Sequence, residues 1–161
     1  MRLLCLLLTV FCLTAAAPDV SAADGKVIKV LSEFLDHKGR QSLHPSLYER
    51  DAYQFFLRSH PDERAALRLA VQWKAKDVDW TKTKMRVEMR GVLGNDLHLT
   101  TREEPVRKNG WFTTWTYFDI SGDDYKKFGT LVAWRVTLFE GDHQLAQQES
   151  FMWSGDVTIP K

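Results

Sequence analysis

The chain has 161 residues, of which 22 are Lys or Arg and 21 are Asp or Glu, and its net charge is +1 at pH 7. This near balance argues against nucleic acid as a partner, because proteins that bind nucleic acid carry a basic patch or stripe. It also gives no support for strong electrostatic steering of the whole protein to a membrane.

The first 22 residues have the pattern of a secretory signal peptide. Arg2 supplies a positive charge, the run from Leu3 to Leu13 is apolar, and Val20-Ser21-Ala22 offers the small residues of a cleavage site. Such a run is too short to remain as a membrane-spanning helix. We therefore expect cleavage after Ala22, an exported protein in the periplasm or outside the cell, and no transmembrane segment in the remaining chain.

Residues 23–161 suit a single domain, because a chain of this length buries about two-thirds of the surface that it exposes when unfolded. Both cysteines, Cys5 and Cys12, lie within the predicted signal peptide. Disulfide, thiol and cysteine–zinc chemistry are therefore excluded from the mature chain. A cysteine-free exported domain is more typical of a bacterial envelope than of eukaryotic secretion, where domains of this size usually carry disulfides.

Residues 26–36 fit two kinds of secondary structure. The apolar residues among them have the spacing of a helical stripe, whereas the β-branched Val27, Ile28 and Val30 favour a strand. We predict a first strand here, because the two-sheet architecture inferred below requires one.

The stretch "PSLYERDAYQFFLRSHP", from Pro45 to Pro61, predicts a helix over residues 46–59. Ser46 and Glu49 have the spacing of a capping box. Pro61 ends the helix, because the residue before a proline avoids the helical region. We expect the helix to dock on a sheet through one apolar arc, roughly 100° wide, formed by Tyr48, Ala52, Phe55 and Phe56.

A second part of this helix is the candidate partner-binding surface. Two apolar residues widen the apolar sector beyond the docking arc, and a polar ladder at i, i+4 and i+8 borders them. Because Arg and Tyr are favoured at interface hot spots, we predict that an unknown protein partner contacts Arg50, Tyr53, Gln54, Leu57 and Arg58. In the alternative interpretation the helix is a buried plug, and Arg50 only pairs with a neighbouring acid.

From Leu67 onward the apolar pattern has period two, which is typical of strands with one face on a core and the other in water. The alternating segments are 69–74, 85–90, 97–102 and 132–139.

The remaining segments predict further strands and their connections. Residues 112–120 are apolar on both faces and predict a central strand, and residues 145–153 predict the last strand. Turn residues at 94–96 and 140–143 predict two hairpins. Residues 121–125 predict a turn or a single helical turn between strands.

Six to seven short antiparallel strands predict a mainly β, two-sheet sandwich with one helix between its first and second strands. The last hairpin, "GTLVAWRVTLFEGDHQLAQQESFMW", resembles the closing hairpin of immunoglobulin-like and fibronectin-type-III-like bacterial domains, and Tyr125 before it has the place of their tyrosine corner. This resemblance covers about the last third of the chain and implies an immunoglobulin-like β-sandwich, without the cysteine pair of true immunoglobulin domains. The stretch "FLDHKGRQSLHPSLYERDAYQFFLR" is similar to the N-terminal part of uncharacterised exported bacterial domains, which implies no particular activity.

No motif predicts catalysis or a cofactor. His44 and His60 flank the predicted helix, so they lie roughly 20 Å apart and cannot share a metal ion. His98 and His143 are isolated in the sequence. No serine lies in a G-x-S-x-G elbow, and adjacent carboxylates in loops are usually only solvated. We therefore expect no enzymatic activity, no cofactor and no metal site.

Trp80 and Trp111 are candidate ligand-stacking residues, because they lie in the charged, loop-like stretches "DVDWTKTK" and "RKNGWF". In the alternative interpretation they only pin loops onto the fold. The first functional expectation is a non-catalytic protein-binding module of the bacterial cell envelope. The alternative is a carbohydrate-binding β-sandwich module that takes a polysaccharide, and the third is a small secreted hydrolase.

Overall fold

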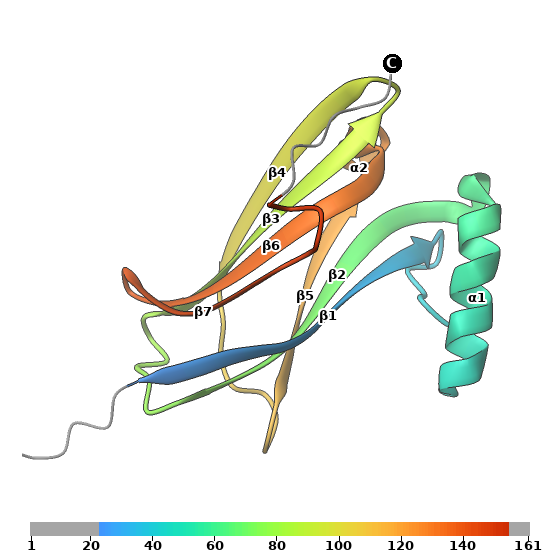
Figure 1. Ribbon diagram of the computed structural model, residues 1–161. Coiled ribbons are helices and arrows are strands. Elements are labelled where there is room, and N and C mark those ends of the chain that lie inside the picture. The colour runs from blue at the N-terminus through green and yellow to red at the C-terminus, as the bar shows by residue number, and fades with distance from the viewer. Residues whose placement is uncertain (1–22, 155–161) are drawn as a thin grey trace, which may run out of the picture.

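The computed structural model describes residues 23–154 (Figure 1), so the predicted signal peptide lies outside the described residues. Within them the chain is mainly β, as predicted, with seven strands, two α-helices and one turn of 3-10 helix. In chain order these are β1 (Asp24–Asp36), α1 (Leu47–Ser59), η1 (Pro61–Glu63), β2 (Arg64–Lys76), β3 (Thr83–Leu93), β4 (Asp96–Pro105), β5 (Thr114–Ser121), α2 (Gly122–Phe128), β6 (Thr130–Glu140) and β7 (His143–Glu149).

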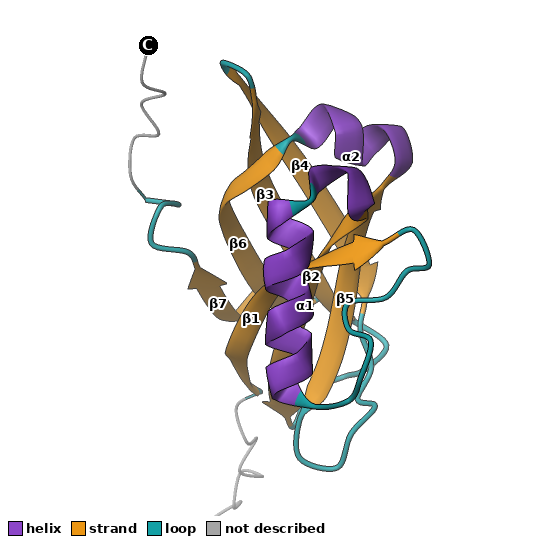
Figure 2. Cartoon of the chain, turned by 90° about the vertical axis from the view of Figure 1, so that its right-hand side faces the viewer, coloured by secondary structure: helices purple, strands orange, loops and turns teal. Residues whose placement is uncertain are grey.

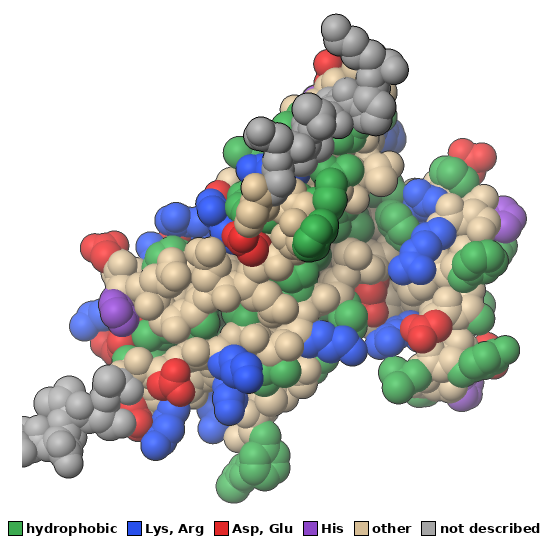
Figure 3. Space-filling view, viewed as in Figure 1, with side chains coloured by type: hydrophobic (Ala, Val, Ile, Leu, Met, Phe, Trp, Pro, Cys, Tyr) green, Lys and Arg blue, Asp and Glu red, His purple; other side chains and the backbone are tan. Residues whose placement is uncertain are grey.

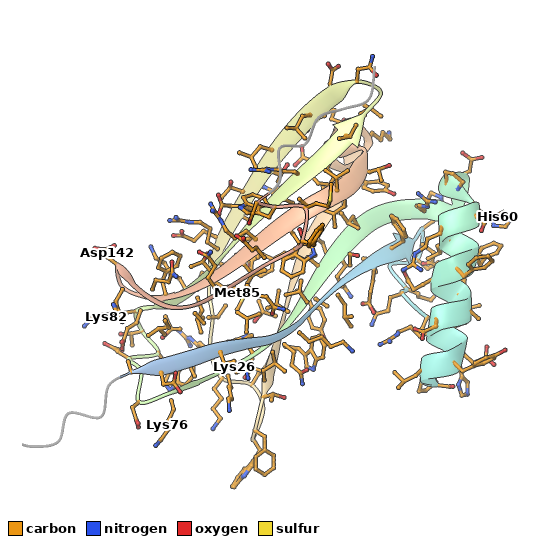
Figure 4. The ribbon with its side chains drawn as sticks, viewed as in Figure 1. Lys26, His60, Lys76, Lys82, Met85 and Asp142 are labelled. Atoms are coloured by element: carbon orange, nitrogen blue, oxygen red, sulfur yellow. The ribbon has the colours of Figure 1, made fainter. Side chains whose placement is uncertain are left out.

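The strands form two antiparallel sheets, with the orders β1-β2-β5 and β4-β3-β6-β7. Both sheets contribute side chains to one buried cluster, in which Val71 and Trp73 of β2 join Met89 of β3 and Val136 of β6. Met85 of β3, labelled in Figure 4, belongs to the same cluster. This shared core follows from the period-two pattern, because each sheet has one apolar face to remove from water.

The two sheets approach most closely where β1 meets β7. A Cβ atom on Gly25 would lie only 2.9 Å from Cβ of Leu145, so no larger residue fits at this position without movement. The N-terminal half of β1 is therefore held against the other sheet. Its C-terminal half curves away with β2 toward α1 (Figure 1).

Several predicted elements are confirmed. The ambiguous segment 26–36 is a strand, the helix begins and ends within one residue of the predicted range 46–59, and hairpin turns join β3 to β4 and β6 to β7. The segment after β5 extends into the short helix α2. The prediction of a capping box is wrong, because the Ser46 side chain makes no hydrogen bond at the start of α1.

The strand predicted at residues 112–120 is present as β5 at Thr114–Ser121, but its predicted central position is wrong. The strand β5 lies at the edge of the three-stranded sheet and pairs with β2 alone. Its second apolar face has local partners instead: the Trp115 and Tyr117 rings lie 6.5 Å apart and nearly parallel. The Arg68 guanidinium covers the Tyr117 ring at 5.1 Å.

In β4 the alternation is present, but the apolar residues face outward. Leu97 and Leu99 are exposed, whereas His98, Thr100 and Arg102 are half-buried on the other face. Because β4 is an edge strand, polar groups on its inner face discourage pairing with another chain.

The last strand ends at Glu149, short of the predicted residue 153. Beyond it the chain turns over the outer face of the four-stranded sheet, where Trp153 is buried between Arg90 at 4.1 Å and Arg135 at 4.8 Å. Arg90 lies on β3 and Arg135 lies on β6. The mixed charges of that face are paired, since Arg135 forms two hydrogen bonds with Glu88.

Candidate functional site

Helix α1 lies against the free edge of β1, at the end where β1 stops (Figure 2). The contact is made by the side-chain amide of Gln54. Its Oε1 accepts a hydrogen bond from the Phe34 N–H at 2.8 Å, and its Nε2 donates to the Phe34 carbonyl at 2.9 Å. The same Nε2 donates to the Gln41 carbonyl at 2.8 Å. The amide therefore bonds the edge of β1 as the backbone of another strand would, which protects that edge from foreign strands.

A second contact fixes α1 through the buried carboxylate of Asp36. Its oxygens accept hydrogen bonds from the Tyr53 hydroxyl at 2.8 Å and from the Arg40 side chain at 2.8 Å, as well as from the N–H groups of Lys38 and Arg40. Burial by itself would raise the pKa of Asp36. The hydrogen bonds outweigh burial and hold that pKa well below its usual range.

The C-terminal end of α1 is held by Leu57 and Arg64. Leu57 is fully buried. The Arg64 guanidinium donates hydrogen bonds to the carbonyls of Leu57 and Arg58, and it covers the Phe34 ring at 4.3 Å. A cation at the carbonyl end of a helix is stabilising, because the last carbonyls lack partners within the helix.

These contacts reverse the predicted orientation of the helix. The docking arc of Tyr48, Ala52, Phe55 and Phe56 faces solvent, because the helix docks through Tyr53, Gln54 and Leu57. Hydrogen bonds to Asp36 and to the edge of β1 set the orientation of the helix. The pattern of apolar residues in the sequence gives no information about these hydrogen bonds.

The result is an exposed apolar surface, which we call the outer face of α1 and define as Leu47, Tyr48, Phe55 and Phe56. Their exposed fractions are 68%, 80%, 69% and 39%. Figure 3 shows hydrophobic side chains on the side of α1 that points away from the sheets. His60, labelled in Figure 4, lies at the end of this face and stacks on Phe56 with the ring centroids 4.2 Å apart.

Between α1 and β1 lies a shallow cleft of about 330 Å³ that holds the buried carboxylate Glu33. Arg50 Nε lies 3.8 Å from Glu33 Oε1, and Arg50 also pairs with the exposed Asp51 at 3.3 Å. Burial raises the pKa of Glu33, and the charges of Arg50 and Arg68 offset only part of this rise. The alternative interpretation of Arg50, pairing with a neighbouring acid, is therefore observed.

The five predicted partner-binding residues do not form one open surface. Gln54 and Leu57 are buried, Tyr53 is bonded to Asp36, and Arg50 is paired across the cleft. Arg58 is exposed at the rim of the cleft. The residues free to meet a partner are those of the outer face of α1. Three of them, Tyr48, Phe55 and Phe56, were predicted to belong to the docking arc. No local signal separates the two arcs, because both are rich in large apolar side chains.

The two predicted stacking residues, 31 positions apart in sequence, line one cavity of about 250 Å³. Trp80 is half-buried and contacts Trp73, with the ring centroids 6.1 Å apart. Trp111 is 86% exposed and its neighbour Phe112 is 83% exposed. Phe112 was not among the predicted stacking residues, although the Asn109-Gly110 turn before it indicates a loop.

The part of the chain that the structure describes contains no group of three or more His, Cys, Asp or Glu side chains able to hold a metal ion. The histidines beside α1 instead bond locally, with His60 Nδ1 at 2.9 Å from the Phe56 carbonyl and His37 Nε2 at 2.9 Å from the Asp62 carbonyl. Over the same residues, no helix has the length and apolar character needed to cross a membrane.

Comparisons with known proteins found no matching family model, no matching curated protein and no matching solved structure.

Proposed function

We propose that this protein is an exported, non-catalytic protein-binding module of the bacterial cell envelope, and that it binds its partner through the outer face of α1. The observation that carries the proposal is the exposure of Leu47, Tyr48, Phe55 and Phe56 on one helix. Large apolar groups that gather on one surface of a soluble domain mark an interaction site more often than scattered ones do.

The way α1 is attached supports this proposal. Gln54, Tyr53 and Leu57 fix the inner side of the helix by hydrogen bonds and burial. A helix held in this way presents its outer side chains without ordering the backbone on binding, which lowers the entropic cost of association. Tyr48, Phe55 and Phe56 have the spacing of anchors that an amphipathic helix inserts into an apolar groove.

The arrangement of the strands supports an immunoglobulin-like sandwich as the finer description of the fold. With the strands lettered A, B, C, C′, E, F and G in chain order, the two sheets are A-B-E and C′-C-F-G. Immunoglobulin-like domains divide their strands in this manner. Tyr125 lies between strands E and F and packs on the core. Its hydroxyl forms no hydrogen bond within residues 23–154, so the tyrosine corner itself carries no weight.

A photo-crosslinking experiment in the exporting cell tests this function. A photoreactive phenylalanine analogue is placed at Phe55 on the outer face of α1 or, as a matched control, at Leu99 on β4, which is 63% exposed. We expect irradiation to give a defined adduct with another polypeptide from position 55 only. Introducing Tyr48→Lys beside the probe should abolish the adduct, because it puts a charge into an apolar contact.

The result would contradict the proposal if position 55 gave no adduct, or the same set of adducts as position 99. Folding is checked independently, since both positions are exposed and the variants should unfold at the wild-type denaturant concentration.

One observation favours the carbohydrate-binding alternative, namely that Trp80 and Trp111 line the same cavity. A sugar ring stacks on an exposed aromatic face, and the exposed Trp111 ring offers one. Protection of Trp111 from a soluble fluorescence quencher by a neutral polysaccharide, and its loss in Trp111→Ala, would support this second function. Unchanged quenching with every envelope polysaccharide would remove it.

A further inference from the structure

Trp111 and Phe112 occupy the loop before β5, at the end of the three-stranded sheet where β1 begins and β2 ends. Both rings project almost completely into solvent. Figure 3 shows hydrophobic side chains protruding at the lower end of the molecule, with Lys and Arg side chains close above them. Two adjacent exposed aromatic rings cost free energy in water, so their position requires an explanation.

Basic side chains surround these rings. The cavity of about 250 Å³ beneath them is lined by three lysines, Lys74, Lys76 and Lys108, and by one acid, Asp24. Within the described residues Lys74 and Lys108 form no ion pair, and Lys76 has only an exposed contact with Asp77 at 3.5 Å. We call this surface the Trp111 end and define it as Lys74, Lys76, Lys108, Trp111 and Phe112.

The loop is held by its own hydrogen bonds. The Asn109 side chain donates to the Trp115 carbonyl at 3.2 Å, and the Asn109 N–H donates to Thr114 Oγ1 at 3.3 Å. Gly110 lies so close to Thr113 that an added Cβ would come within 2.0 Å of the Thr113 carbonyl oxygen. The turn therefore requires glycine, and it directs the two rings away from the core.

We propose that the Trp111 end docks on an anionic lipid bilayer, with Trp111 and Phe112 in the interfacial layer and the three lysines facing lipid phosphates. Tryptophan favours the boundary between headgroups and acyl chains, because its ring is apolar and its N–H is polar. Lysine places its apolar stem along such a surface and its ammonium group in the headgroup layer.

The composition of the Trp111 end favours a bilayer over a protein partner. Lysine is depleted in the cores of protein interfaces, whereas juxtamembrane lysines are attracted by anionic lipids. The near-zero net charge of the whole chain does not oppose this inference, because screening limits the interaction to charges within about 10 Å of the surface.

This inference is independent of the partner-binding role of α1. The strand β1 runs from the Trp111 end to the helix, and its 13 residues span roughly 40 Å in extended form. Docking at one end therefore leaves the outer face of α1 accessible (Figure 1).

Vesicle co-sedimentation with the protein of residues 23–161 tests the proposal. We expect binding to phosphatidylglycerol vesicles, weaker binding to equal mixtures with phosphatidylcholine, little binding to phosphatidylcholine alone, and loss of affinity as salt is added. The double variant Trp111→Ser, Phe112→Ser should bind about tenfold more weakly or worse. The double variant Lys74→Glu, Lys108→Glu should lose about fivefold or more for each lysine.

Matched controls exist at the other surfaces of the chain. Tyr48→Ser with Phe55→Ser removes two exposed rings from α1, and Lys126→Glu with Lys127→Glu reverses two exposed charges on α2. Both control variants should bind vesicles like the wild type.

Insertion of the ring is measured separately. Brominated acyl chains should quench part of the tryptophan fluorescence, and Trp111→Phe should abolish that quenching while vesicle binding persists. The proposal is overturned by equal affinity of the Trp111, Phe112 double variant, by equal binding to neutral vesicles, or by the absence of quenching. Failure of vesicle binding leaves the crosslinking test of α1 unaffected, so the two proposals fail separately.

Discussion

Gln54 shows how one polar side chain decides the placement of a helix. Its amide has a donor and an acceptor at the separation of a backbone N–H and C=O, and the two groups of Phe34 that face away from β2 are paired by it. An unpaired buried N–H or C=O costs free energy. This side chain therefore fixes which side of α1 faces the edge of β1.

We expect Gln54→Leu to lower the free energy of unfolding by about 1–3 kcal/mol, because Phe34 and Gln41 lose their hydrogen-bond partners. Urea denaturation followed by circular dichroism measures the change. Gln144→Leu on the exposed face of β7 is the control and should shift stability by less than about 0.5 kcal/mol. An unchanged midpoint for Gln54→Leu would show that the amide does not hold the helix.

The carboxylate of Asp36 predicts an acid-sensitive contribution to stability. Its pKa is lower in the folded chain than in the unfolded chain, so the folded state favours the ionised form. The contribution is complete above the unfolded pKa, about 4, and is lost as the pH falls toward the lower folded pKa. We expect Asp36→Asn to be destabilised by about 2 kcal/mol at pH 7, and its deficit relative to wild type should shrink below about pH 4.

The Glu33 carboxylate predicts a pH dependence of stability opposite to that of Asp36. Its pKa is raised by burial, so its ionised form is less favourable in the folded chain. Glu33→Gln should therefore gain stability relative to wild type as the pH rises through the raised pKa. Denaturant midpoints of both variants from acid to neutral pH measure the two effects, and parallel curves for all three proteins would contradict both assignments.

At the scale of the element, α1 has two apolar arcs and only one is docked. Leu57 is fully buried, whereas Phe55 is 69% exposed. We expect Leu57→Ala to cost about 2–5 kcal/mol, because it removes packed atoms and leaves a cavity. Phe55→Ala should change stability by less than about 0.5 kcal/mol. Chemical denaturation of the two variants distinguishes the two helix orientations. A larger loss of unfolding free energy for Phe55→Ala would show that the helix docks through the arc predicted from the sequence.

In the strands too, the sequence pattern predicts the type of element but not which face is buried or where the strand lies in its sheet. The alternation in β4 correctly predicts a strand, yet Leu97 and Leu99 face outward. On the opposite face of β4, Arg102 pairs with Asp124 of α2 at 2.9 Å. In β5 the doubly apolar pattern suggests a central strand. The observed edge position is accommodated by the contacts of Trp115, Tyr117 and Arg68.

At the scale of the whole molecule, one core is shared by both sheets and contains no cysteine. We expect the thermal midpoint of residues 23–161 to be the same with and without a chelator, and with and without a reductant, since these residues include no cysteine that could form a disulfide. Differential scanning calorimetry measures the midpoint. A large decrease with chelator would reveal a metal site and overturn the interpretation of the histidines.

Local patterns in the sequence determined the types of most elements. The period-two segments, the turn residues between them and Pro61 after the helix each act on the backbone through neighbouring residues, so they are readable without knowledge of the fold. The mainly β class and the boundaries of α1 follow from such signals.

Only the tertiary structure decided which faces are covered. The orientation of α1 depends on bonds from Gln54 to Phe34 and from Tyr53 to Asp36, which join residues 20 and 17 positions apart. The meeting of Trp80 and Trp111 at one cavity depends on the pairing of distant strands. A pattern reports how apolar each face is, but burial is decided by which face finds hydrogen-bonding and packing partners, and those partners come from elsewhere in the chain.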